Sequence, residues 1–246
     1  MQPSVAALTD RGRKRSGNED ALLALPDTGL FIVADGLGGH AAGEVASGIA
    51  VEVIGAKLAG IAGALPAPAL EAPLRSAMIA AHHAIRARAA HEPEKTGMAT
   101  TLTALAIADD GHAFRIGHVG DSRAYLLRDG RLRQLTTDHT WVQQQIESGL
   151  LSPARARTHP NAGVLTRALG IADGDPKIDI IPGRIEPGDL LLLCSDGLTG
   201  PVADADIRAI LDRDLPLDAL AAQLVDAANL RGGPDNITVI LIRAAP

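Results

Sequence analysis

The sequence predicts an α+β fold built on antiparallel β-sheet. Short apolar runs follow one another across tight turns, such as Asp109-Asp110-Gly111 and Asp129-Gly130, as they do in consecutive hairpins. Hairpins join antiparallel neighbours, whereas parallel strands need long crossover connections, so a doubly wound parallel sheet is not expected. Four longer regions are predicted to be helical: 42–59, 68–90, 204–212 and 216–230.

Strands are predicted where short apolar or β-branched runs end in turn residues. The turn Pro26-Asp27-Thr28-Gly29 joins the second and third of these runs as a hairpin. Leu190 to Cys194 is the most apolar run in the chain. In chain order, the predicted strands span residues 5–8, 21–25, 30–34, 99–108, 112–119, 124–127, 132–135, 178–185, 190–194 and 237–243.

The two long N-terminal helices are predicted from apolar residues at helical spacing. The inward residues of the first are Val45, Ile49, Val53, Ile54 and Leu58, and those of the second are Leu70, Leu74, Ala77, Met78, Ala81 and Ile85. Pro73 indicates a late start or a kink near the beginning of the second helix. His82, His83 and His91 are expected on the helix surface, because adjacent histidines point to different sides of a helix.

Three shorter segments are distinguished between residues 140 and 169. Residues 140–148 and 164–169 are predicted to be short helices, and 149–161 an irregular polar segment. A loop of that length in a compact domain often acts as a functional flap. We find no internal repeat or linker and expect one domain over residues 1–246, with a flap subdomain at about 149–170.

Composition excludes several classes of protein. The chain has 246 residues, 46% of them hydrophobic, which is enough for one large core. A formal net charge of -6 and only 2% aromatic residues argue against a nucleic-acid partner. No apolar stretch approaches the length of a membrane span, and the N-terminus has no signal-peptide pattern. With a single cysteine, Cys194, these features predict a cytoplasmic protein without disulfides.

Four aspartates lie at ends of predicted strands: Asp35, Asp121, Asp196 and Asp235. Any one of them, particularly beside glycine, is explained most simply as a turn residue. Together, with Glu19-Asp20 as further candidates, they suggest a shared site. Converging carboxylates raise each other's pKa and need a cation. An all-oxygen ligand set favours Mg²⁺ or Mn²⁺ over Zn²⁺, and two such ions would suit hydrolysis of a phosphoester.

The loop from Thr9 to Asp20 places four basic residues beside an acidic pair. One interpretation is a solvated charged surface. The other is that one arginine reaches inward and holds an anion with its planar guanidinium group.

Five ordered motifs resemble those of the metal-dependent protein phosphatases, specifically the bacterial branch of the type 2C serine/threonine phosphatases. Two further segments, Thr136-x-Asp138-His139 and 165–170, are similar to those on either side of that family's flap. The resemblance covers more than 220 residues in matching order. The motifs are Gly12-x-x-Arg15-x-x-Asn18-Glu19-Asp20, Asp35-Gly36-Leu37-Gly38-Gly39-His40, Gly120-Asp121-Ser122-Arg123, Ser195-Asp196-Gly197-Leu198 and Asp235-Asn236-Ile237-Thr238.

The resemblance implies two packed antiparallel sheets flanked by pairs of helices, and a role for each motif residue. Asp35 would bridge two metals, with the Gly36 carbonyl as a further ligand. Asp196 and Asp235 would hold one of the two, and Asp121 with Asp196 would hold a third metal. Glu19 and Asp20 would contribute through bound waters, and Arg15 would hold the substrate phosphate. A metal-bridging hydroxide would then attack phosphorus.

One position departs from part of the family. Leu37 stands where some members carry a histidine that is proposed to protonate the leaving group, so the resemblance leaves the proton donor unassigned. His40 lies nearby in sequence and is expected to have a structural role at the start of the following helix.

The resemblance therefore implies a phosphatase that acts on phosphoserine and phosphothreonine in proteins with two to three Mn or Mg ions. Its expected partners are phosphorylated proteins and an opposing serine/threonine kinase, with no nucleic acid or membrane, and the chain is expected to be a monomer. Two alternatives remain: a phosphatase-like module that binds partners without turnover, and a metal-dependent hydrolase of a small phosphoester.

Overall fold

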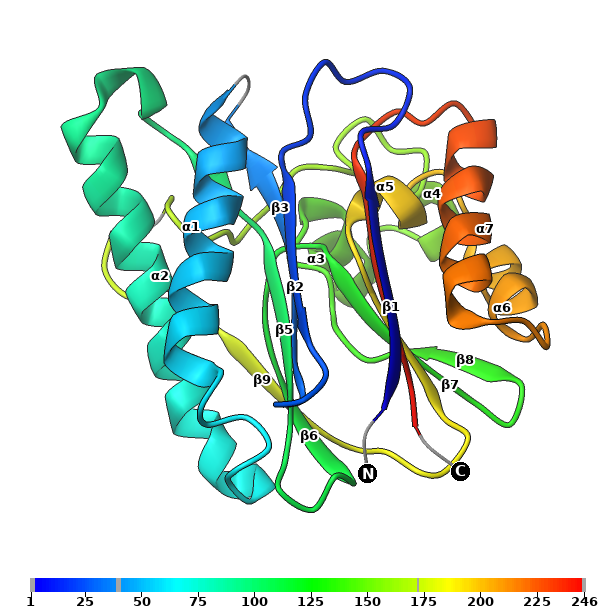
Figure 1. The fold of residues 1–246 in the computed structure, drawn as a ribbon. Helices are drawn as coiled ribbons and strands as arrows, with labels where there is room; N and C mark the ends of the chain where they lie inside the picture. Colours follow the sequence, from blue (N-terminus) through cyan, green and yellow to red (C-terminus); the bar gives the residue numbers. More distant parts are fainter. Residues whose placement is uncertain (1–2, 39–40, 172, 245–246) are drawn as a thin grey trace.

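The computed structural model describes residues 3–38, 41–171 and 173–244, and within them two antiparallel β-sheets pack face to face (Figure 1). One sheet has the order β1-β11-β10-β7-β8, and the other β2-β3-β5-β6-β9, with the short β4 paired to β3. The strands are β1 (Ser4–Asp10), β2 (Asp20–Leu25), β3 (Leu30–Leu37), β4 (Ala99–Thr100), β5 (Leu102–Ile107), β6 (Ala113–Val119), β7 (Arg123–Arg128), β8 (Arg131–Gln134), β9 (Asp179–Arg184), β10 (Leu190–Cys194) and β11 (Ile237–Arg243).

Pairs of helices cover the outer faces of the two sheets, which confirms the predicted fold class. Helices α1 (Ala41–Leu58) and α2 (Glu71–His91) lie on one side in Figure 1, and α6 (Asp204–Leu211) and α7 (Leu217–Leu230) on the other. Three apolar clusters match these layers: one lies between the sheets, and one lies under each helix pair. Shorter helices are α3 (Trp141–Glu147), α4 (Pro153–Ala156) and α5 (Asp196–Thr199), with single 3₁₀ turns at Ala67–Leu70 and Pro93–Lys95.

The prediction of a helix at 164–169 was wrong. This segment is extended, and isolated bridges pair Leu165 with Thr140 and Leu169 with Thr100. The backbone amide and carbonyl groups of Leu169 exchange hydrogen bonds with those of Thr100. These long-range bonds satisfy backbone groups that an isolated helix would have paired internally.

Two details of the N-terminal helices also differ from the predictions. His82 is fully buried, not on the surface, and its Nδ1 accepts a hydrogen bond from the Gly170 amide; His83 and His91 are exposed. In α1 the predicted inward residues Ile54 and Leu58 are buried, but Val45, Ile49 and Val53 are only partly buried. Ala46 and Ala50, which were not predicted to face inward, are completely buried. Small residues on that face allow the helix to approach the sheet closely.

The antiparallel arrangement brings strand ends from distant parts of the sequence to the same end of the two sheets. Asp10, at the end of β1, pairs with Ile237, at the start of β11, and Cys194, at the end of β10, pairs with Val239. In the other sheet, Asp20 at the start of β2 pairs with Asp35 near the end of β3. The strand ends that carry the predicted acids therefore meet at the end of the molecule that contains the β1–β2 loop (Figure 1).

Candidate metal centre

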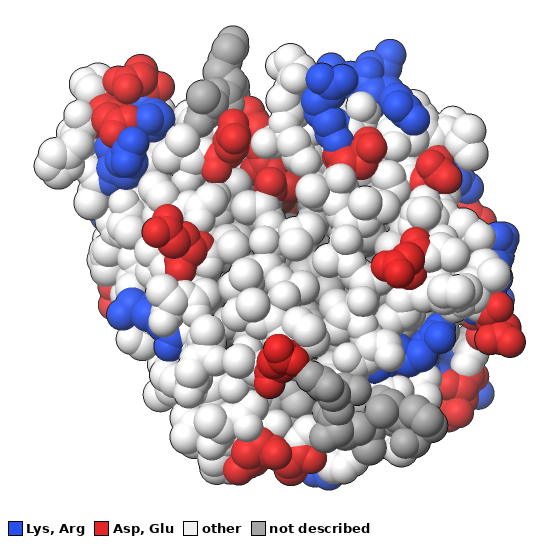
Figure 2. Space-filling model, in the orientation of Figure 1, with Lys and Arg blue, Asp and Glu red and all other residues white. Residues whose placement is uncertain are grey.

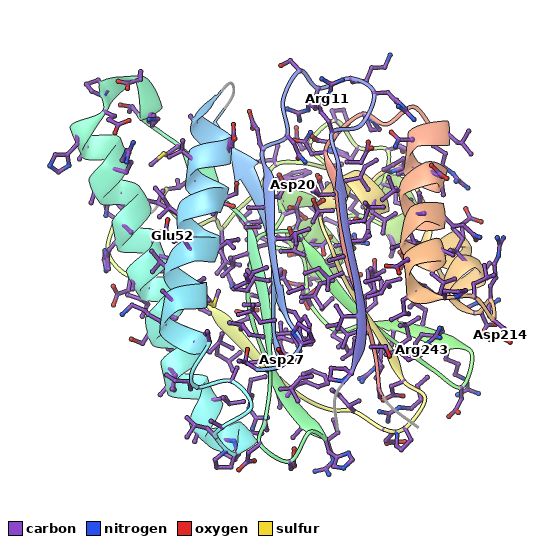
Figure 3. The ribbon with its side chains drawn as sticks, in the orientation of Figure 1. Arg11, Asp20, Asp27, Glu52, Asp214 and Arg243 are labelled. Atoms are coloured by element: carbon purple, nitrogen blue, oxygen red, sulfur yellow. The ribbon has the colours of Figure 1, made fainter. Side chains whose placement is uncertain are left out.

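Seven of the eight predicted site residues line one cavity of about 110 Å³. They are Arg15, Glu19, Asp35, Gly36, Asp121, Asp196 and Asp235. The eighth, Asp20, lies beside Asp35 in the β2–β3 hairpin, near the same end of the sheets (Figure 3). Leu37, the departure noted in the sequence, also lines this cavity, whereas His40 lies outside the described residues.

Asp35 is held by two threonines of the neighbouring chain segment. Its carbonyl oxygen accepts hydrogen bonds from the Thr101 amide, at 2.9 Å, and from the Thr100 hydroxyl, also at 2.9 Å. Its own amide donates to the Thr101 hydroxyl at 3.1 Å. The backbone of Asp35 is therefore fixed on both sides, so its carboxylate leaves the strand from a rigid position. Neither threonine belongs to a motif that pointed to this role.

The two carboxylate oxygens of Asp20 differ in their hydrogen bonding. Its Oδ2 accepts from the Ser195 hydroxyl at 2.7 Å and from the Thr238 hydroxyl at 2.6 Å. Its Oδ1 is buried and has no hydrogen-bond partner among the described residues, as is also true of Asp196 Oδ1. A buried carboxylate oxygen without a donor is costly unless a cation completes its environment.

The acids repel one another strongly. Burial, followed by repulsion from Asp196, Asp20 and Asp121, raises the pKa of Asp35 well above its usual value. Burial also raises the pKa of Asp20 to about 7, against hydrogen bonds that lower it.

The same causes act on the remaining acids of the cavity. The pKa of Asp121 is raised by burial and then by Asp196, and that of Asp196 by burial and then by Asp235. No three side chains of the histidine, cysteine, aspartate or glutamate type in the described ranges form a ready-made metal cage. Asp235 instead faces Arg15, whose guanidinium nitrogen lies 2.6 Å from its carboxylate. The negative charge and the oxygen donors of these acids fit divalent cations.

Asn236 ties the β1–β2 loop to β11. Its side-chain nitrogen donates to the carbonyl oxygens of Arg11 and Gly17, both at 2.9 Å, and its side-chain oxygen accepts from the Glu19 amide at 2.8 Å. Asn236 itself is 3% exposed, so its side chain is held inside the loop that it anchors. Asn236 belongs to the motif at 235–238, but its anchoring role depends on partners some 220 positions away in sequence, which the motif does not reveal.

Two glycines make close backbone approaches around the cavity. A Cβ atom at Gly36 would lie 2.2 Å from the Gly43 carbonyl oxygen in α1. At Gly12, which has a φ of 77°, it would lie 2.1 Å from the Asp235 carbonyl oxygen. Larger residues are therefore excluded at both positions.

His139 holds the loop that carries Asp121. The His139 amide donates to the Gly120 carbonyl at 2.8 Å, and the Gly120 amide donates to His139 Nδ1 at 3.1 Å. On its other side, His139 Nε2 lies 3.1 Å from Asp179. The neighbouring Asp138 pairs with Arg123 at 2.7 Å. The motif Thr136-x-Asp138-His139 thus supports the cavity from behind, a role that the sequence alone did not indicate.

A family model described as protein phosphatase 2C matches residues 10–231 of the chain. The serine/threonine protein phosphatase PstP of Mycobacterium tuberculosis is 43% identical over 237 residues, which make up 96% of this chain. The chain spans only 44% of the length of that relative. The serine/threonine phosphatase stp of Listeria monocytogenes is 39% identical over 237 residues, covering 95% of this chain and 93% of the relative.

A solved structure of the catalytic domain of PstP, in complex with two manganese ions, superimposes with a TM-score of 0.86 at 39% identity and covers 99% of both chains. The family model extends over most of the chain and includes all the acids that line the cavity except Asp235. The chain belongs to the protein phosphatase 2C family.

Proposed function

We propose that this chain is a metal-dependent serine/threonine protein phosphatase that hydrolyses phosphoserine and phosphothreonine in proteins. The observation that carries the proposal is the convergence of five buried or partly buried carboxylates with one arginine in a small cavity at the sheet edge. The family membership and the manganese-bound structure of a relative support it.

For these acids we propose the metal-ligand roles that the family resemblance implies. Asp35 would be shared between two cations, with the Gly36 carbonyl beside it, and Asp196 and Asp235 would hold one of the two. Asp121 and Asp196 would serve a third cation, while Glu19 and Asp20 would act through water. The buried, unpartnered Oδ1 atoms of Asp20 and Asp196 support this assignment, because each lacks a donor within the described residues.

Two or three Mn²⁺ or Mg²⁺ ions would supply the activated water and the charge stabilisation that phosphoester hydrolysis requires. The chain's own residues supply the rest. Thr100 and Thr101 fix the position of Asp35, and Ser195 and Thr238 orient Asp20. Position 37 on the cavity wall is a leucine, so this position cannot supply a histidine to protonate the leaving oxygen.

Arg15 is the proposed phosphate-binding residue. Its side chain is 48% exposed and lies at the cavity with one guanidinium nitrogen on Asp235. The remaining donors of its planar guanidinium can hold a phosphate group, which accepts several hydrogen bonds. Arg15 therefore orients the substrate against the acids that hold the cations.

A second cavity of about 320 Å³ adjoins the first and shares Asp121, Asp196 and Gly163 with it. Its walls include Val142 and Ile146 from α3 and Pro153, Ala156 and Arg157 from the flap. This position supports a flap subdomain at about 149–170 that selects the protein segment around the phosphorylated residue.

We propose that a serine/threonine kinase opposes this phosphatase, that the chain is monomeric and cytoplasmic, and that it acts without nucleic acid. The acidic composition supports the last point. In the described residues, no helix is both long enough and apolar enough to cross a bilayer.

The proposed function is tested by measuring Mn²⁺-dependent release of phosphate from phosphothreonine and phosphoserine peptides and from small phosphoesters. Preference for the peptides is expected. Turnover of small metabolite esters with no peptide hydrolysis would instead support the small-phosphoester alternative. Peptide binding without turnover at saturating Mn²⁺ would support a non-catalytic module.

Replacing Arg15 with alanine is expected to raise the KM for a phosphothreonine peptide by about tenfold or more, with a smaller fall in kcat, because a charge-assisted phosphate contact is lost. Inhibition by inorganic phosphate should weaken in parallel. Arg15→Lys is the matched control: it keeps the charge beside Asp235 but loses the planar fork, so partial recovery is expected. An unchanged KM and unchanged phosphate inhibition would remove Arg15 from substrate binding.

A further inference from the structure

The β1–β2 loop concentrates positive charge in an otherwise acidic protein. Four of the five residues at 11–15 are basic, namely Arg11, Arg13, Lys14 and Arg15, whereas the chain has a net charge of -6. We call Arg11, Arg13 and Lys14 the basic rim. Figure 2 shows a group of basic side chains at the end of the molecule formed by the β1–β2 loop. Figure 3 shows Arg11 on the loop itself.

The rim charges face solvent and are little neutralised. Arg11, Arg13 and Lys14 are all exposed. Arg15 at the end of the basic run pairs with Asp235. Arg11 donates to the backbone carbonyl of Ser16 instead. The adjacent Asp10 offsets part of the charge, but its carboxylate already accepts from the Gly12 amide and from Asn229.

The loop is fastened to the segment between α7 and β11, which carries Asp235. The amides of Arg13 and Lys14 donate to the Gly233 carbonyl at 2.8 and 3.2 Å. Asn236 holds the Arg11 carbonyl on the other side of the loop. The rim therefore keeps a fixed position next to Arg15 and does not depend on a mobile tail. A fixed cation cluster binds an extended acidic segment at a lower entropic cost than a flexible one.

We propose that the basic rim binds acidic or additionally phosphorylated residues that flank the target phosphoresidue, so that this chain prefers acidic phosphoprotein segments. The inference rests on the proposed phosphatase function and adds a substrate class to it. A peptide whose phosphate lies on Arg15 must pass close to residues 11–14, because Arg15 belongs to the same short loop. Each exposed ion pair contributes little, but three acting on one segment produce a measurable preference.

The test compares two phosphothreonine peptides that are identical except for their flanks, which carry aspartate and glutamate in one and asparagine and glutamine in the other. The triple variant Arg11→Gln/Arg13→Gln/Lys14→Gln keeps much of each side-chain stem and removes the charge. We expect the wild type to prefer the acidic peptide in kcat/KM by about tenfold, and the variant to lose that preference. Raising the salt concentration should also reduce the preference of the wild type.

The controls separate this inference from folding and from basal activity. The double variant Arg131→Gln/Arg133→Gln removes exposed charge from β8, at a distance from the β1–β2 loop in Figure 1, and should retain the preference. Hydrolysis of p-nitrophenyl phosphate and the melting temperature should be the same in the triple variant as in the wild type.

Four outcomes would overturn the inference. Equal kcat/KM for both peptides in the wild type would do so while leaving the phosphatase function intact, as would an acidic preference that survives in the triple variant. If the rim binds anionic phospholipid vesicles and the triple variant leaves the ratio of kcat/KM for the two peptides unchanged, the rim binds a membrane surface and not the substrate. Absence of turnover of either peptide would instead count against the phosphatase function, and the inference would fall with it.

Discussion

Replacement of Asp35 by asparagine is expected to abolish Mn²⁺-dependent hydrolysis of a phosphothreonine peptide and at the same time to stabilise the metal-free protein. Both effects have the same cause. The carboxylate lies among Asp196, Asp20 and Asp121, which repel it, and burial adds to the cost of its charge. Bound divalent cations would offset the repulsion between the carboxylates. Without cations, the charge of Asp35 destabilises the folded state.

The loss of activity should be about 10³-fold or more, because the residue proposed to be shared between two cations is removed. Stabilisation of the protein by Mn²⁺, measured as a rise in melting temperature, should fall sharply in the variant. This second readout does not depend on turnover, so it tests metal binding directly. Retention of both activity and Mn²⁺-induced stabilisation would contradict the assignment of Asp35.

The gain in metal-free stability should depend on pH. The pKa of Asp35 is raised in the folded protein above its ordinary value of 3.8, so below that pH the group is neutral in both states and contributes no difference. As the pH rises, the unfolded chain ionises more readily, and the wild type loses stability relative to the variant. We expect a melting temperature higher by about 3 °C or more at neutral pH, and none of this gain near pH 3.5.

Asp214→Asn provides the matched control for both measurements. Asp214 is exposed in the connection between α6 and α7, on the far side of the molecule from the candidate metal centre (Figure 3). The same chemical change there should leave activity, Mn²⁺-induced stabilisation and the pH profile unchanged. A metal-free Asp35→Asn protein that is less stable than the wild type at neutral pH would show that the carboxylates are not mutually repulsive.

Asn236→Ala should be the most damaging substitution outside the acids themselves. It leaves the Arg11 and Gly17 carbonyls and the Glu19 amide without their side-chain partner. Each buried backbone group left unpaired costs about 1–3 kcal/mol, and relaxation of the loop recovers part of this. We therefore expect the free energy of unfolding, measured by urea denaturation, to fall by about 3 kcal/mol.

The same substitution should loosen the loop that carries Arg15 and the basic rim. A larger KM for phosphopeptides is expected, together with weaker protection of the loop amides from hydrogen exchange. Asn161→Ala, the same change at an exposed flap position, should alter stability by less than about 0.5 kcal/mol. Unchanged loop protection in Asn236→Ala would mean that the backbone bonds to Gly233 suffice to hold the loop.

The sequence alone determined the layers of the fold and the identity of the acids. Leu190 to Cys194 and Ile237 to Arg243 are strands with the predicted bounds, because short apolar runs between turn residues have little alternative in a buried sheet. The inward face of α2 was also predicted correctly: its predicted residues from Leu74 to Ile85 are buried, because helical spacing places them on one side. Likewise, the acids were recognisable because glycine-flanked aspartates recur at strand ends.

Features that depend on contacts between residues far apart in the sequence could be seen only in the tertiary structure. The segment at 164–169 is extended because Thr100 and Thr140 pair with it, and local preference could not show those partners. His82 is buried because Gly170 lies against it, and Asn236 is an anchor because the β1–β2 loop closes over it. Periodicity encodes which face of an element is buried, whereas hydrogen bonds across roughly 90 to 220 residues follow from how the sheets and loops pack together.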